Sequence, residues 1–292
     1  MSEAGSNAGV EPIDLASFEG FDQVIRPSRG LMPINFAELW RYRELLWFLA
    51  WRDILVRYKQ TVIGVLWVLV QPLLTMVILT VIFGRLAKMD SQGVPYAILT
   101  LAAILPWQFF SAALLQSSNS LVAQSNLVSK VYFPRLILPL SSIVSAGFDF
   151  LVSLGLLLVM MPLLGVSFRM HLLLLPAFAL VAVLATLCLT MWLSAMNVKY
   201  RDVKHVVPFI VRMGMYLSPV GFLSSVIPEE WRFWYSLNPM VGVIDGFRWC
   251  ILGPDFAPYW PGMILGLAGM AVLLVGGVYY FRATEKTFAD VI

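Results

Sequence analysis

Apolar residues recur along the chain in long runs without a charged side chain. From Gln60 to Gly84 the sequence is QTVIGVLWVLVQPLLTMVILTVIFG, and similar runs follow at intervals. A run of about 20 apolar residues crosses a hydrocarbon core of about 30 Å as a helix. The pattern therefore predicts six spanning helices, over residues 62–84, 96–116, 136–164, 172–194, 206–226 and 262–281.

Composition agrees with this pattern. The chain is 60% hydrophobic and only 13% charged, with a mean hydropathy of +0.82, whereas soluble domains carry about 25% charged residues. We expect an all-α integral membrane protein. The net charge of +3 gives no reason to expect nucleic-acid binding.

The N-terminal region contains acidic residues and lacks the apolar core of a signal peptide. Lys and Arg residues that flank the spans lie mostly on the side of the N-terminus, which predicts that both termini are cytosolic. The few on the opposite side are Arg85, Lys88, Arg169, Arg232 and Arg248. We expect a cytosolic tail (1–34), an interfacial helix (35–60), a six-helix transmembrane domain (61–282) and a cytosolic C-terminal tail (283–292).

The segment before the first span has a helical pattern of its own, FAELWRYRELLWFLAWRDILVRYKQ. At 100° per residue its aromatic residues Trp40, Trp47, Trp51 and Tyr58 share one side, and Arg41, Arg52, Asp53, Arg57 and Lys59 share another. Such a helix lies in the membrane interface. An acid among the basic residues suits a protein partner better than anionic lipid, so this charged face is also a candidate contact for a cytosolic protein.

Two connecting segments are unusual. The segment SSNSLVAQSNLVSKVYFPR, between the second and third spans, is amphipathic and too polar to span. Residues 224–261, before the last span, interleave aromatic residues with prolines. Two short re-entrant helices would fit there, and an interfacial aromatic belt is the alternative.

Two ionisable residues fall inside predicted spans, Asp149 in the third and Arg212 in the fifth. Charges at that depth are costly unless paired or hydrated, so both are candidate functional residues. They either pair with each other or make separate polar contacts between helices.

Catalytic and nucleotide-binding patterns are missing from the sequence. His171 and His205 are the only histidines, and no acidic cluster has metal-ligand or acid–base spacing. The phosphate-binding pattern GxxxxGK[ST] does not occur. We expect a chain that is no enzyme and binds no cofactor or metal, so ATP-driven transport would need a separate ATPase.

Several segments, taken in order, carry a resemblance to a known family. They are WRDILVRYKQTVIGVLWVLVQPLL, ILPWQFFSAALLQSSNSLVAQSNLVSKVYFPRLILPL, YRDVKHVVPFIVRMGMYLSPVGF and SLNPMVGVIDGFRW. Over about residues 35–290 the chain resembles the permease subunits of ABC-2 type polysaccharide exporters, which export O-antigen, capsule and teichoic acid.

The resemblance implies a homodimer that binds two copies of an ATP-binding cassette subunit, which would hold the ATP and Mg. It implies export of lipid-linked polysaccharide, with O-antigen as the expected polymer, across a bacterial inner membrane. Aromatic faces pack well on sugar rings. Our channel candidates are Trp67, Gln71, Trp107, Phe109, Phe110 and Tyr216.

The same resemblance implies a contact surface for the ATPase. Its candidates are Arg52, Asp53, Arg57 and Lys59, then Lys130, Phe133, Pro134 and Arg135, then Lys199, Arg201 and Asp202. Three other functions stay open. They are an ABC-2 type exporter of drugs or lipids, a membrane enzyme such as a lipid-linked glycosyltransferase, and a stand-alone channel or secondary carrier.

Overall fold

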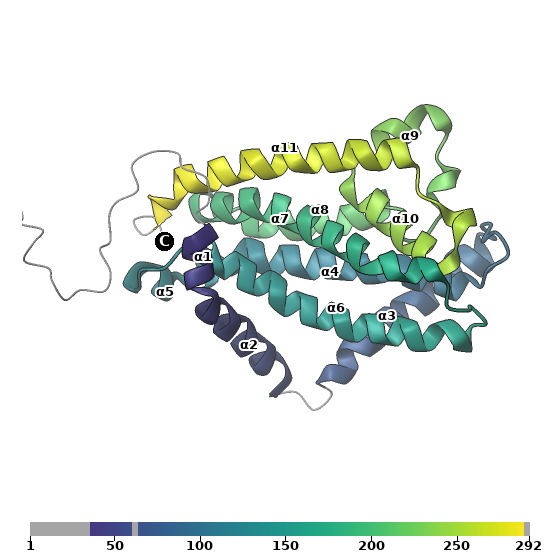
Figure 1. Cartoon of the computed structure of the whole chain (residues 1–292), viewed down its shortest axis with the longest axis horizontal. Helices are drawn as coiled ribbons and strands as arrows, with labels where there is room; N and C mark the ends of the chain where they lie inside the picture. Colours follow the sequence, from purple (N-terminus) through teal and green to yellow (C-terminus); the bar gives the residue numbers. More distant parts are fainter. Residues whose placement is uncertain (1–35, 60–63, 289–292) are drawn as a thin grey trace, which may run out of the picture. The chain divides into compact units, whose positions relative to one another are not determined.

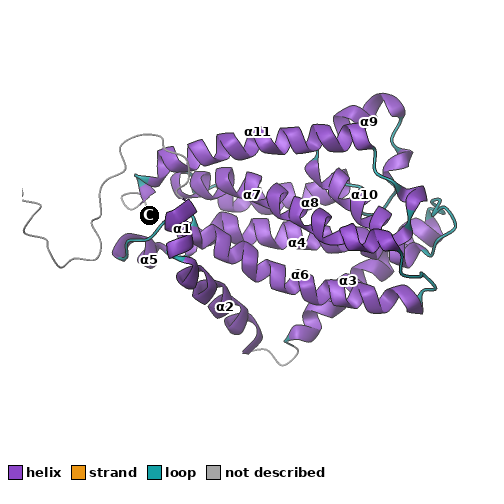
Figure 2. Ribbon diagram, viewed as in Figure 1, coloured by secondary structure: helices purple, strands orange, loops and turns teal. Residues whose placement is uncertain are grey.

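The computed structural model describes residues 36–59 and 64–288 of the 292-residue chain. Within these residues all regular structure is helical (Figure 2). The predicted tail over 1–34, the predicted start of the first span at residue 62 and residues 289–292 lie outside this part of the chain.

The helices follow one another as Figure 1 labels them. The longer ones are α2 (Arg43–Lys59), α3 (Val65–Leu79), α4 (Tyr96–Ala123), α6 (Ile137–Leu163), α7 (Leu175–Lys199), α8 (Val203–Leu217), α10 (Pro239–Leu252) and α11 (Trp260–Glu285). The shorter ones are α1 (Phe36–Arg41), α5 (Ser125–Lys130) and α9 (Glu229–Tyr235). A π-helical segment, Thr80–Leu86, continues α3, and 3-10 turns occupy Met170–Leu174, Ser224–Val226 and Pro254–Phe256.

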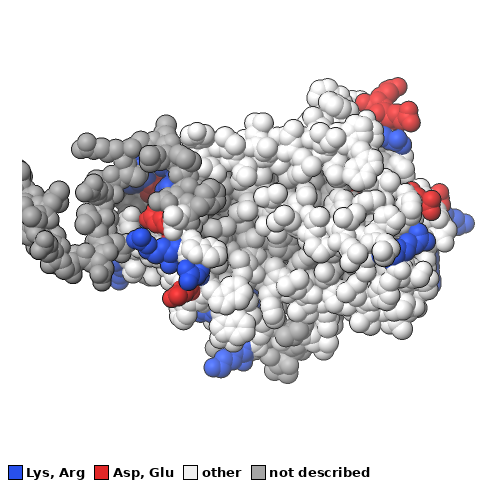
Figure 3. Space-filling view, in the orientation of Figure 1, with Lys and Arg blue, Asp and Glu red and all other residues white. Residues whose placement is uncertain are grey.

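Five helices among the described residues are long and apolar enough to cross a membrane. They are Leu66–Leu86, Tyr96–Ala123, Ile137–Leu163, Met170–Lys199 and Trp260–Glu285, and they coincide with five of the six predicted spans. On the face in Figure 3, charged side chains gather at two ends, and a broad band of uncharged side chains lies between them. That distribution is the one a membrane-embedded bundle requires.

The predicted helix over 206–226 is wrong in its extent, because α8 ends at Leu217. Ser218 is extended, with φ −105° and ψ 153°. Pro219 follows it, and a proline favours this conformation in the residue before it. The 15 residues of α8 rise only about 22 Å. This helix alone is therefore shorter than a hydrocarbon core of about 30 Å.

The prediction was also wrong where it ended the second span at 116, because α4 continues to Ala123. The serines there fit a helix since their hydroxyls donate to backbone carbonyls of the preceding turn, as Ser120 does to Ser117 at 2.8 Å. Ser117 also lies 2.7 Å from the hydroxyl of Thr190 on α7. Polar residues in this segment thus join two helices instead of forming a loop.

Helix α4 is the centre of the packing. It contacts α3, α6, α7, α8 and α10, and 78% of its most apolar stretch is buried, against 11% for the helix over Leu66–Leu86. Helix α11 lies along α7 (Figure 1), and α2 packs against α6. Side chains on α4 are consequently core residues on nearly every face.

A second apolar cluster lies where α2 meets the ends of the long helices. Its buried members include Leu49, Leu121, Val128, Phe133, Ile137, Met191, Phe281 and Phe288. Residues from α2, α4, α5, α6, α7 and α11 meet there. The cluster fixes the first half of α2 against the bundle, and it includes part of the predicted C-terminal tail.

Two short helices, α9 and α10, form before the last span, and their predicted re-entry into the membrane stays a prediction. Helix α10 starts at Pro239. Asn238 caps it, since its side-chain oxygen accepts a hydrogen bond from the backbone N–H of Met240 at 3.0 Å. It ends before Gly253, whose φ of 109° suits a residue without a side chain. Helix α10 packs against α4, α7 and α11, whereas α9 leaves Trp231 and Trp234 exposed.

Candidate functional site

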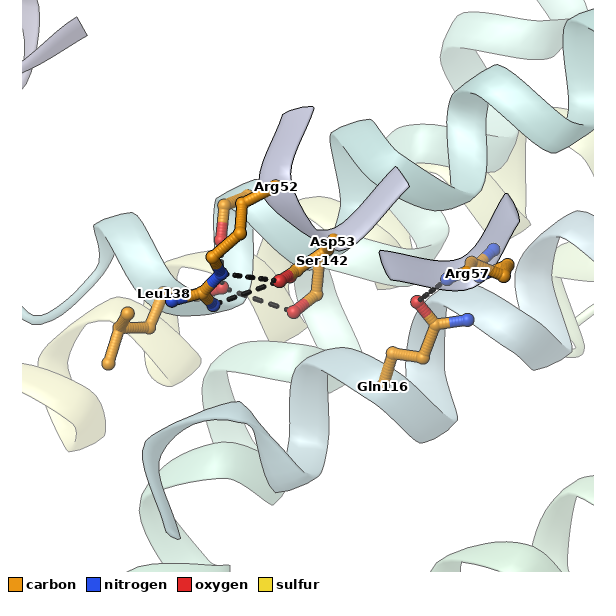
Figure 4. A network of polar contacts seen from close by, with 7 residues as sticks. Arg52, Asp53, Arg57, Gln116, Leu138 and Ser142 are labelled. Carbon is orange, nitrogen blue, oxygen red and sulfur yellow. Dashed lines mark hydrogen bonds and ion pairs between the residues drawn. The ribbon is translucent and has the colours of Figure 1, made fainter. Parts of the chain in front are cut away.

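A polar network joins α2 to two other helices. The guanidinium of Arg57, in the last turn of α2, forms an ion pair with Asp149 of α6. It also donates to the amide oxygen of Gln116 on α4 at 2.8 Å (Figure 4). The hydroxyl of Tyr58 donates to the other oxygen of Asp149. Asp149 is thus paired with Arg57, and not with Arg212 as one sequence-based alternative had it.

The helical spacing of α2 explains why Arg57 faces inward. Leu49, Ala50 and Ile54 are buried, and at 100° per residue Arg57 falls among them. The position of Asp149 at the middle of α6 then lets the long side chain of Arg57 reach it. Burial raises the pKa of Tyr58, and the hydrogen bond to Asp149 raises this pKa further. Its hydroxyl therefore stays protonated and donates.

The charged residues predicted to share one side of α2 differ in their surroundings, because Arg57 contacts Asp149 of α6 whereas Arg52 and Lys59 line an outer groove. Arg52 and Lys59 lie on the same side as Phe48, Trp51, Leu55 and Val56, and these six residues line one shallow groove. The four apolar members are exposed. Arg52 pairs with its neighbour Asp53 at 2.9 Å within α2 (Figure 4). The outer surface of α2 is therefore apolar and cationic at once.

The other candidate ATPase contacts differ in exposure. Lys130, Lys199, Arg201 and Asp202 are exposed, and Pro134 and Arg135 are half-buried. Phe133, in contrast, is buried in the second apolar cluster, 2% exposed. Its ring lies 5.2 Å from the guanidinium of Arg135. Phe133 anchors this loop to the bundle and presents no surface to a partner, because its side chain is buried in that cluster.

The channel candidates separate into two groups. Trp107, Phe109 and Phe110 on α4 are buried, at 4–6% exposure. They pack in the core because α4 is covered on nearly all sides; the ring of Phe109 lies 5.2 Å from that of Phe150 on α6. Trp67, Gln71 and Tyr216 are exposed. Only this second group presents its side chains to a surface.

Arg212 lies on the exposed face of α8. Val203, Val207 and Val211 form the buried face, and His205, Phe209, Arg212 and Tyr216 form an exposed stripe within about 60° of helical arc. None of the described carboxylates forms an ion pair with Arg212. A cation thus lies between Phe209 and Tyr216 in the apolar part of α8 that follows His205.

Sequence reasoning missed a buried cation on α10. Arg248 is 1% exposed and donates to the carbonyl oxygens of Leu99, Phe222 and Val220 at 3.4, 2.9 and 3.3 Å. Its guanidinium lies 3.8 Å from the carboxylate of Asp245, one turn earlier. The spacing of Asp245 and Arg248 on an apolar helix, VGVIDGFRWCIL, was the available signal.

Metal chemistry finds no support in the described ranges. No group of three or more His, Cys, Asp or Glu side chains there is arranged to hold a metal ion.

Comparison with known proteins gives a consistent result. The family described as ABC-2 type transporter matches residues 44–252. The O-antigen export system permease protein RfbA of Myxococcus xanthus is 29% identical over 259 residues, which cover 87% of this chain and 97% of the relative. A Klebsiella pneumoniae protein of the same name is 27% identical over 256 residues, covering 85% of this chain and 95% of the relative. The inner membrane transport permease YadH of Escherichia coli (strain K12) is 27% identical over 213 residues, covering 66% and 79%.

Proposed function

The chain belongs to the ABC-2 type transporter family, and we propose that it is the membrane subunit of an ATP-driven exporter of lipid-linked polysaccharide. It is a multi-pass membrane protein. The observation that carries the proposal is its similarity to O-antigen export permeases over almost their whole length, 95–97% of each relative. Similarity to YadH, whose name states no cargo, covers less of both chains. An exporter of drugs or simple lipids is the weaker candidate, because none of these relatives is named for such a cargo. O-antigen is the proposed polymer.

A separate ATP-binding subunit completes the proposed transporter. We assign it two copies, with ATP and Mg bound there, around a homodimer of this chain. The proposed contact surface combines the outer side of α2, with the half-buried Arg52 and Asp53 and the exposed Lys59, and the exposed charges Lys130, Lys199, Arg201 and Asp202. Arg135 borders it. Arg57 and Phe133 are no longer included, because their side chains turn toward other helices of the bundle.

The proposed glycan path follows the exposed faces of α3 and α8. An exposed arginine in an apolar helix is costly against lipid, so water or an anion is the better neighbour for Arg212. Aromatic faces such as those of Trp67 and Tyr216 pack on sugar C–H groups without binding tightly. Gln71 offers a hydrogen bond to hydroxyls. A sliding polymer needs this combination of weak, repeated contacts.

The predicted fifth span is proposed to cross the membrane as α8 together with the irregular segment after it. Helices α9 and α10 are proposed to re-enter the membrane from the outside. Irregular backbone at membrane depth requires protein partners for its polar groups. Arg248 supplies them, since it donates to the carbonyls of Val220 and Phe222. We place the protein in a bacterial inner membrane with both termini in the cytosol.

Deletion of the gene tests the proposed function. We expect long glycan to vanish from the cell surface and lipid-linked glycan to accumulate on the cytosolic face, with recovery when the wild-type chain is returned. Unchanged surface glycan without any accumulated intermediate, in a strain with no second exporter, would contradict the glycan cargo.

A further inference from the structure

Helix α2 is held to the bundle by two different attachments. Its first half is fixed by apolar packing, with Leu49 and Ala50 at 1–2% exposure. Its last turn is held by polar contacts, in which Arg57 and Tyr58 engage Asp149 of α6 and Arg57 engages Gln116 of α4. These contacts are partly open to solvent, with the side chains of Arg57 and Asp149 exposed by 31% and 20%.

The position of Asp149 places the polar attachment far from the end of α6. It lies 12 residues after the start of α6 at Ile137, or about 18 Å along the helix. The contact of α2 therefore reaches the middle of α6 and, through Gln116, the central helix α4.

The ion pair between Arg57 and Asp149 also suits a contact that lets the helices shift better than one that fixes them. We call this contact the joint. Both partners are charged side chains on separate helices, 92 residues apart in the sequence. Partial solvent exposure lowers the cost of separating them, because water replaces part of what each charge loses. A pair of this kind holds two helices in register and still permits one to shift.

We infer that Arg57 and Asp149 are positioning residues that transmit movement of α2 to α4 and α6 during transport. The inference rests on the proposed function, and it removes Arg57 from the ATPase contact. Tyr58 and Gln116 orient the two charges. Arg52 and Asp53, one turn earlier, pair within α2 and connect it to no other helix through that pair.

The test uses the complex of the full chain with the ATP-binding subunit that co-purifies with it. Asp149→Asn keeps the size and shape of the side chain and one of its two acceptor oxygens, so the fold is expected to persist. We expect the complex to form and hydrolyse ATP within about twofold of wild type, while glycan export falls about tenfold, a size typical of residues that couple two sites. Arg57→Lys keeps the charge without the planar fork and is expected to fall between.

A double variant checks that the two residues act together. Asp149→Asn with Arg57→Gln is expected to export about as much as either single variant, because each change removes the same interaction. Losses that multiply would overturn the inference. Glu229→Gln is the matched control, since it removes the carboxylate of an exposed ion pair on α9, and export there is expected to stay at the wild-type level.

Other outcomes are equally decisive. Normal export by Asp149→Asn and by Arg57→Gln would overturn the inference, and so would loss of the ATPase from the Asp149→Asn complex. Failure of the wild-type chain to restore export would instead contradict the proposed function. A measurement independent of cargo is hydrogen exchange of the purified chain: Asp149→Asn is expected to speed exchange in the last two turns of α2, and unchanged exchange there would count against the joint.

Discussion

Arg57 and Arg248 are both cations inside a largely apolar bundle, and they are satisfied in opposite ways. Arg57 reaches from α2 to side chains on α6 and α4 and stays partly exposed. Arg248 is fully buried and donates to three backbone carbonyls, beside Asp245 on its own helix. The first arrangement connects elements that are able to move apart. The second supplies hydrogen bonds to the irregular segment after α8, together with Tyr96, whose hydroxyl donates to the carbonyl of Gly221, and it is therefore a fixed part of the fold.

Removing the buried cation should have the largest effect. Arg248→Leu removes the donor to the carbonyls of Val220 and Phe222 in the irregular segment and leaves the carboxylate of Asp245 uncompensated. We expect a loss of about 3–5 kcal/mol in the free energy of unfolding, seen as low yield and a lower unfolding temperature in detergent. The matched control is Arg212→Leu, the same change at an exposed side chain; equal unfolding temperatures for the two variants would contradict the comparison.

Neutralising the ion pair between Arg57 and Asp149 should lower the free energy of unfolding less than removing Arg248. Asp149→Asn removes the ion pair with Arg57 and keeps one acceptor oxygen for Tyr58. A loss of about 1–3 kcal/mol in the free energy of unfolding is expected, as for a weakened hydrogen bond to a charged group. Thermal unfolding in the same detergent measures it. A loss as large as that of Arg248→Leu would show that the joint is part of the rigid core.

A smaller change addresses the orientation of Asp149. Tyr58→Phe removes one hydroxyl donor and keeps the ring, whose centroid lies 6.1 Å from that of Phe148. We expect a loss of about 1 kcal/mol in the free energy of unfolding. Combined with Asp149→Asn, the losses should be less than additive; strict additivity would mean that Tyr58 and Asp149 do not interact.

The smallest effect on folding is expected at the exposed pair. Arg52→Gln breaks an ion pair between neighbours on α2, in which Arg52 is 42% exposed, so the free energy of unfolding should fall by at most about 1 kcal/mol. Association is the more sensitive measurement. Arg52→Glu should reduce the amount of ATPase that co-purifies, and undiminished capture would remove Arg52 from the proposed contact.

The sequence predicts the spans well because each depends on local composition. Long charge-free runs form helices wherever they occur, and five of them have matching helices in the structure. The ends were predicted less well. Serine hydroxyls let α4 continue to Ala123, and Pro219 ends α8 at Leu217 by forcing Ser218 out of the helical conformation.

The candidate site depended on contacts that no local pattern encodes. Asp149 was singled out by its depth, but its partner Arg57 lies 92 residues away, and Arg57 had been assigned to the outer surface of α2. Arg248 was counted as an exterior charge, because a count of basic residues between spans does not distinguish a loop from a buried helix. Trp107, Phe109 and Phe110 were expected in a channel, yet the central position of α4 buries them.

Transport by purified components tests the central claim most directly. Vesicles would contain this chain with or without its ATP-binding subunit, lipid-linked glycan accessible from the side of that subunit, and ATP. We predict that glycan becomes accessible to a glycosidase on the opposite side only when both subunits and ATP are present. Equal transport by the chain alone, without ATP, would contradict the account and identify the protein as a stand-alone channel or carrier.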